Sequence, residues 1–179
     1  MDMTLSENAT SADNQQERLE HISDDLGHYL SGFSDGEGSF NISMIRRKLD
    51  YRSGWKIVVS FNISQREATI PKLFSEVLQC GTIRYRRDGV CYFEVRKLTD
   101  IDTKVRTFFE RFPLRSKRQA FRLNQLLLVV DIMKRNGHLK AQGLEEVLEI
   151  RQTMVSNRKR KYELADVLQN PQRLHAETA

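Results

Sequence analysis

The sequence has 179 residues and a mass of 20.9 kDa, which is enough for one compact domain with its own hydrophobic core. No apolar run approaches the roughly 18 residues of a membrane span, and the first residues contain no secretion signal. We therefore expect a soluble intracellular protein. The two cysteines are too few for a disulfide framework or a four-ligand zinc site.

The charge is distributed unevenly along the chain. The formal net charge is +5, but residues 1–25 contain seven acidic residues and one basic residue. Subtracting them from the totals of 29 basic and 24 acidic residues leaves 28 and 17, a net charge of +11 on the rest of the chain. This excess favours a polyanionic partner, which can be a nucleic acid or an anionic membrane surface.

Composition divides the chain into three parts. Residues 1–23 are polar, with almost no large apolar side chain, and are expected to form a disordered leader. Residues 24–165 contain the periodic apolar patterns of a folded domain, and residues 166–179 form a C-terminal tail.

The folded part alternates between helical and strand periodicity. A first helix is expected to begin after a cap at Asp24 or Asp25 and to stop at the glycines near position 36. The later elements, in chain order, are strands over 39–45 and 56–64, a helix over 69–80, strands over 82–87 and 90–95, and helices over 99–112, 116–133 and 144–154.

This order predicts an α+β fold of the type αββαββα, followed by C-terminal helices. Two hairpins can form one four-stranded antiparallel sheet, with the helices packed against a single face. The apolar side chains of the strands would face the helices, and the polar side chains would lie on an open face.

The segment Leu30–Gly38, with the sequence LSGFSDGEG, departs from ordinary helix composition. Gly32 and Gly36 lie four residues apart on the same side of the first helix, and each costs about 1 kcal/mol relative to alanine. Small residues at this spacing let a second helix backbone approach closely. Alternatively, one glycine simply ends the helix.

Glu37 is placed against the local electrostatics. A carboxylate at a helix C-terminus faces the negative end of the helix dipole, which is unfavourable by roughly 0.3–1 kcal/mol. A divalent cation would reverse the sign, because Mg²⁺ binds one or two carboxylates together with water and phosphate oxygens. The alternative is an exposed glutamate without a function.

The segment Leu30–Gly38 resembles, position by position, the nine-residue motif of the LAGLIDADG homing endonucleases, and the order of elements is similar over about residues 25–165. The resemblance implies that the motif helix pairs with a second motif helix across a two-fold axis, and that Glu37 and Gly36 bind a catalytic metal at the base of the pair. Since one motif copy is present, the sequence is similar to the homodimeric members. The implied dimer interface comprises Gly32, Gly36, Ser31 and Asp35.

Two further positions match catalytic sites of that family. Gln65, at the end of the second strand, matches a glutamine that orders water in the active site. Lys117 matches a basic residue near the scissile phosphate, where it could stabilise developing charge. Arg115 or Arg118 could take this role instead.

The open face of the sheet is the expected DNA-binding surface, because a β-ribbon fits the major groove and polar side chains can read base edges there. The predicted residues on this face are Ser39, Asn41, Ser43, Ile45, Arg47, Lys56, Val58, Ser60, Asn62, Ser64, Thr82, Arg84, Arg86, Cys91 and Phe93. A basic run near the end of the chain is predicted to contact phosphates: Asn157, Arg158, Lys159, Arg160 and Lys161.

These features together predict a homodimeric, site-specific endonuclease that hydrolyses double-stranded DNA with Mg²⁺ or Mn²⁺ at a long pseudo-palindromic site. No membrane and no small-molecule cofactor is expected as a partner. The alternatives are a protein of the same fold that binds DNA or assists intron RNA splicing without cutting, and a basic interaction protein.

Overall fold

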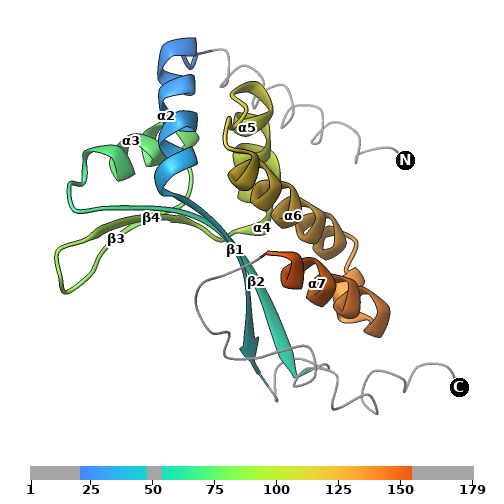
Figure 1. The fold of residues 1–179 in the computed structure, drawn as a ribbon. Coiled ribbons are helices and arrows are strands. Elements are labelled where there is room, and N and C mark those ends of the chain that lie inside the picture. Colours follow the sequence, from blue (N-terminus) through green and yellow to red (C-terminus); the bar gives the residue numbers. More distant parts are fainter. Residues whose placement is uncertain (1–20, 48–53, 155–179) are drawn as a thin grey trace, which may run out of the picture. The chain divides into compact units, whose positions relative to one another are not determined.

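The computed structural model describes residues 21–47 and 54–154 (Figure 1). By its internal contacts the described part of the chain separates into two compact units, one with residues 21–39 and 61–119 and the other with residues 40–47, 54–60 and 120–154. Strands β1, Gly38–Arg46, and β2, Trp55–Gln65, pass from one unit into the other. The polar segment 1–20 and the C-terminal residues 155–179, including the expected tail, lie outside the described residues.

The first unit contains the motif helix and most of the smaller elements. These are α2, Asp24–Glu37; α3, Thr69–Leu78; β3, Thr82–Tyr85; β4, Cys91–Val95; and a continuous helical segment made of α4, Leu98–Asp100, a π-helix η1, Ile101–Val105, and α5, Arg106–Arg111. The helix predicted over 99–112 is therefore present, with one widened turn inside it.

Most of α6, Lys117–Lys134, belongs to the second unit, with the 3₁₀ turn η2, Gly137–Leu139, and α7, Ala141–Thr153. The predicted start and end of α6 are confirmed. The Ser116 hydroxyl accepts a hydrogen bond from the Gln119 amide at 3.4 Å, and Asn136 adopts the left-handed conformation with φ of 56°. Helix α7 begins at Ala141, earlier than its first large apolar residue.

The strands form one sheet in the order β1-β2-β4-β3, which confirms the α+β class and the four-stranded antiparallel sheet. Aromatic rings fill the core of the first unit. The Phe61 ring lies 5.5 Å from Phe109 and 6.2 Å from Phe93 between centroids, and Phe74 stacks on Phe93 at 5.9 Å. Such ring pairs each contribute about 0.5–1.5 kcal/mol beyond their buried area.

The predicted cap of α2 is wrong by one residue. Ser23 precedes the helix in extended conformation, and its side chain accepts a hydrogen bond from the Leu26 amide at 3.4 Å. Asp24 and Asp25 instead lie in the first turn, where their charges favour the positive end of the helix dipole. Asp24 also forms an ion pair with Arg111 of α5 at 3.1 Å.

The prediction that Cys91 and Phe93 of β4 lie on the open face of the sheet is wrong. Cys91 and Phe93 are fully buried, and in the register Phe93 lies opposite Ile63 of β2 and Ile83 of β3. Because side chains alternate along a strand, Tyr92 and Glu94 occupy the open face instead. Ser60 is also buried, although it alternates with the polar positions of β2.

In the described part of the chain, no helix is both long enough and apolar enough to cross a membrane.

Candidate active site and nucleic-acid interface

Glu37 is the last residue of α2, and the chain continues directly into β1 (Figure 1). Its side chain is exposed, and no described residue forms a hydrogen bond or ion pair with its carboxylate. The direct passage requires glycine at position 38, because a Cβ there would collide with the Ser34 carbonyl oxygen. The fold thus holds an unpaired carboxylate at the negative end of the helix.

Two buried or half-buried side chains join the end of α2 to the start of α6. The Asp35 carboxylate accepts hydrogen bonds from the backbone amides of Arg115 at 2.8 Å and Ser116 at 3.1 Å. The buried Gln119 amide donates to the Gly38 carbonyl at 2.8 Å. Glu37 therefore lies between two anchored positions, and Lys117 lies between their partners.

Lys117 is the first residue of α6, and its side chain is exposed. Arg115 and Arg118 are exposed as well, so the alternatives for the basic residue remain open. Gln65 is half-buried at the end of β2. The hairpin of β1 and β2 is closed by the 2.7 Å bond from the Arg47 amide to the Gly54 carbonyl, so the end of β2 returns to the end of the sheet where β1 begins.

The donor atoms at this place fit a metal shared with a substrate. Within residues 21–47 and 54–154, no group of three or more His, Cys, Asp or Glu side chains could enclose a cation. A free carboxylate beside helix-end carbonyl groups, such as that of Gly36, matches what Mg²⁺ takes from a protein when phosphate oxygens and water complete its shell. Glu37 and Gly36 thus offer oxygen donors of the kind that such a site requires.

The outer face of α2 has the shape of a helix-packing surface. Gly32 and Gly36 are exposed, and a Cβ added at either would meet no atom within 4 Å. Tyr29, one turn before Gly32, is 52% exposed. Small residues flanked by an exposed aromatic ring leave room for a second backbone at close range.

Two residues of the predicted dimer interface do not lie on that surface. Ser31 is buried within its own unit, and its hydroxyl has no hydrogen-bond partner among the described residues. Asp35 points to the start of α6, where it accepts the two backbone bonds described above. Ser31 and Asp35 each precede one of the two glycines by one residue, so their side chains leave the helix in a different direction from the open face at Gly32 and Gly36.

The open face of the sheet contains most of the predicted DNA-binding positions. Side chains that are exposed or half-buried there are Ser39, Asn41, Ser43, Ile45, Lys56, Val58, Asn62, Ser64, Thr82 and Arg84, with Arg47 just past β1. The register aligns Ser64, Tyr92 and Arg84 in one row, and Asn62, Glu94 and Thr82 in the next. The sequence prediction missed Tyr92 and Glu94, although the apolar alternation of Cys91, Phe93 and Val95 could have identified them.

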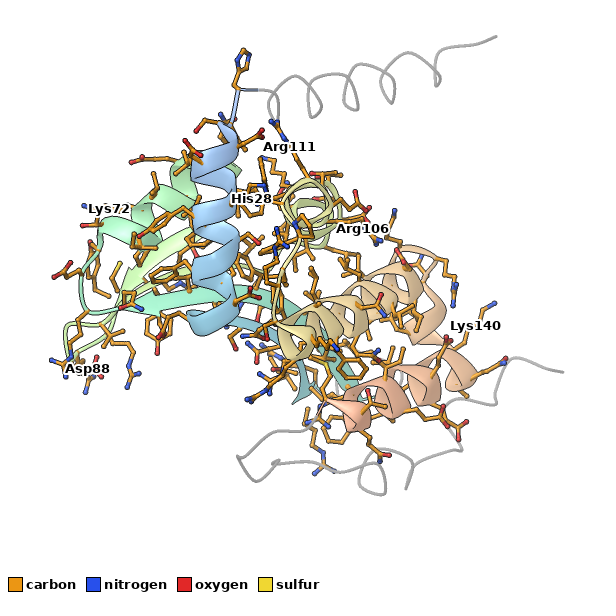
Figure 2. The ribbon with its side chains drawn as sticks, turned by 45° about the horizontal axis from the view of Figure 1, so that its top comes forward. His28, Lys72, Asp88, Arg106, Arg111 and Lys140 are labelled. Atoms are coloured by element: carbon orange, nitrogen blue, oxygen red, sulfur yellow. The ribbon has the colours of Figure 1, made fainter. Side chains whose placement is uncertain are left out.

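Arg86 lies beyond β3 and is bound to its own hairpin. Its Nη1 donates to the Tyr92 hydroxyl at 2.8 Å, and its Nη2 lies 3.0 Å from the Asp88 carboxylate. Asp88 lies at the turn of this hairpin (Figure 2). The hydrogen bond to Tyr92, and then the charge of Asp88, raise the pKa of this guanidinium above its ordinary value. The basic run Asn157–Lys161 lies outside the described residues.

Comparison with known proteins identifies the family. Residues 30–124 match the model of the LAGLIDADG endonucleases. The crystal structure of the homing endonuclease I-TnaI matches with a TM-score of 0.68 and 28% identity, over 74% of this chain and 89% of that one. The I-LtrWI LAGLIDADG homing endonuclease bound to target DNA matches with a TM-score of 0.70 and 28% identity, over 77% of this chain and 47% of that one.

Two relatives are similar in sequence. A probable intron-encoded endonuclease of Neurospora crassa is 27% identical over 72% of this chain, and the DNA endonuclease I-CvuI of Chlorella vulgaris is 30% identical over 63% of it. The chain spans 27% and 66% of these proteins' lengths. The family model covers more than half of the sequence and includes the α2 motif and the start of α6. The chain belongs to the LAGLIDADG endonuclease family.

Proposed function

We propose that this protein is a site-specific endonuclease that cleaves double-stranded DNA as a homodimer with Mg²⁺ or Mn²⁺. The observation that carries the proposal is the unpaired carboxylate of Glu37, held at the end of a helix whose outer face is open at Gly32 and Gly36. Family membership and the DNA-bound relative I-LtrWI support a DNA substrate. The net charge of +11 beyond residue 25 supports a polyanion as well.

In this proposal each side chain has one task. Glu37, with the Gly36 carbonyl, would hold the divalent ion, which activates water and stabilises the leaving oxygen in phosphodiester hydrolysis when bound. Gln65 would orient the attacking water through its amide. Lys117 would lie beside the scissile phosphate and stabilise the added negative charge, with Arg115 or Arg118 as the alternative.

A second copy of the chain would supply the second carboxylate. Cutting both DNA strands requires two active sites, and the sequence contains one copy of the motif. Packing two copies of α2 along Gly32 and Gly36 would bring one Glu37 from each chain to either side of a two-fold axis. Two-fold symmetry then implies a pseudo-palindromic target with two half-sites of about 10 base pairs each.

Selection of cleaved duplexes from a randomised DNA library with Mg²⁺ tests the proposal. We expect one family of pseudo-palindromic sites to be cut on both strands, and we expect Glu145→Gln, an exposed change on α7, to leave cutting unchanged. Specific binding without cutting would favour a DNA-binding protein of the same fold. Preferential binding of structured intron RNA would favour a role in splicing, and no salt-sensitive affinity for either would contradict the proposal.

A further inference from the structure

The open face of the sheet contains one acidic side chain. Among the residues of the four strands β1 to β4, Glu94 is the only aspartate or glutamate. A carboxylate on a surface that meets DNA is repelled by phosphates unless it pairs with a cation or accepts hydrogen bonds from bases. Glu94 therefore requires a specific explanation.

Glu94 is paired with Arg96, the residue two positions later on the same side of the chain. The Arg96 Nε lies 2.9 Å from the Glu94 Oε1. The side chain of Arg96 is 55% exposed, whereas that of Glu94 is only 14% exposed. The carboxylate is thus largely covered, and the guanidinium is the part of the pair that a ligand would meet.

The geometry of this pair leaves the end of the guanidinium available. The printed contact of Arg96 with Glu94 is made through Nε, and among the described residues Glu94 is the partner of this guanidinium. In Arg86 the situation is the reverse, since Tyr92 and Asp88 occupy both of its Nη groups. Arg96 can therefore offer a two-pronged donor without first breaking contacts within its own chain.

We propose that Arg96, held in place by Glu94, is a base-specificity determinant that recognises a guanine in the DNA target. The inference rests on the proposed function. A guanidinium that is 55% exposed and held through its Nε can offer its Nη groups to the O6 and N7 acceptors of guanine in the major groove, and a side chain whose direction is already fixed loses less conformational freedom on binding. Glu94 is a positioning residue, which acts on DNA through Arg96.

The test uses the full chain and duplexes randomised over roughly two helical turns, bound without a divalent metal and then sequenced. The key variant is Arg96→Lys, which keeps the charge but removes the fork. We expect the wild-type sites to contain a guanine that Arg96→Lys no longer prefers, a loss of about 5- to 150-fold in discrimination, while affinity for random DNA changes little. The matched control is Arg135→Lys, which should leave every preference unchanged; Arg135 follows the end of α6 and forms an ion pair with Glu146 of α7.

Glu94→Ala tests the positioning role. We expect it to weaken the same guanine preference while raising the affinity for random DNA, because an acidic group is removed from the binding face. In the Arg96→Lys background, Glu94→Ala should have no further effect on base preference. A general disturbance of the strand would instead lower the affinity for the selected sites and for random DNA alike.

The inference is overturned if Arg96→Lys selects the same sites with the same guanine preference as the wild type. It is also overturned if Glu94→Ala changes preference equally in both backgrounds. A wild-type protein that selects no sequence contradicts the proposed function itself, so the two failures are distinguishable.

Discussion

The bonds that Asp35 accepts from the start of α6 should contribute substantially to stability. Asp35→Asn preserves the shape of the side chain but replaces one carboxylate oxygen with an amide group. That amide would face a backbone N–H, either of Arg115 at 2.8 Å or of Ser116 at 3.1 Å from the present oxygens. Hydrogen bonds to a charged group contribute about 1.5–3 kcal/mol each, and a neutral one about 1 kcal/mol. Since Arg115 is exposed and water can replace part of the lost bonding, we expect a net loss of about 2 kcal/mol.

Urea denaturation measures this loss. The midpoint should fall while the slope stays unchanged, because the surface exposed on unfolding is the same. Asp25→Asn is the control, since Asp25 is exposed in the first turn of α2 and should contribute less than about 1 kcal/mol through the helix dipole. If Asp35→Asn unfolds at the same urea concentration as the wild type, the two bonds do not fasten α2 to α6. The reasoning about Glu37 and Lys117 would then lose its structural basis.

Three further changes have expected outcomes. Gly32→Leu should leave the protomer folded, because the added side chain meets no atom of its own chain within 4 Å, but sedimentation should show monomers in place of dimers. Phe93→Ala should lower the unfolding free energy by about 3–5 kcal/mol, since the ring is fully buried, and should leave the guanine preference intact once folded. Burial lowers the pKa of His138 below the value of about 6.5 that it has in the unfolded chain. The stability that the neutral imidazole contributes is therefore fully present above pH 6.5, and it is lost as the pH falls through the pKa of the folded state. When unfolding midpoints are measured at a series of pH values, His138→Gln should remove the decrease in stability over this acidic range.

The sequence was sufficient to predict the elements whose signals are local. The i, i+3, i+4 spacing from Leu26 to Phe33 predicts α2, and Ser116 with Asn136 marks both ends of α6. The π-helix at Ile101–Val105 has no such signal. There, hydroxyls of Thr103 and Thr107 bond to carbonyls four residues earlier, an arrangement that depends on the rotamer as well as the residue type.

The candidate site shows the same division. The position of Glu37 could be predicted, because its conflict with the helix dipole is visible in the sequence. The sequence prediction placed Cys91 and Phe93 on the open face of the sheet, but both are buried, and the neighbouring Tyr92 and Glu94 occupy that face. The partners of Asp35, Arg86 and Arg96 could not be predicted, because they depend on side-chain directions that the sequence pattern leaves open.

DNA cleavage by the Glu37→Gln variant tests most directly the central claim that Glu37 is the catalytic carboxylate. The protein and its variant are mixed with a selected duplex and Mg²⁺, and binding and cutting are measured on the same samples. Because the change removes the metal-binding charge at almost constant volume, we expect binding to persist and double-strand cutting to fall by at least about 100-fold. A variant that cuts at the wild-type rate would show that Glu37 is not the catalytic carboxylate, and the proposed active site would be wrong.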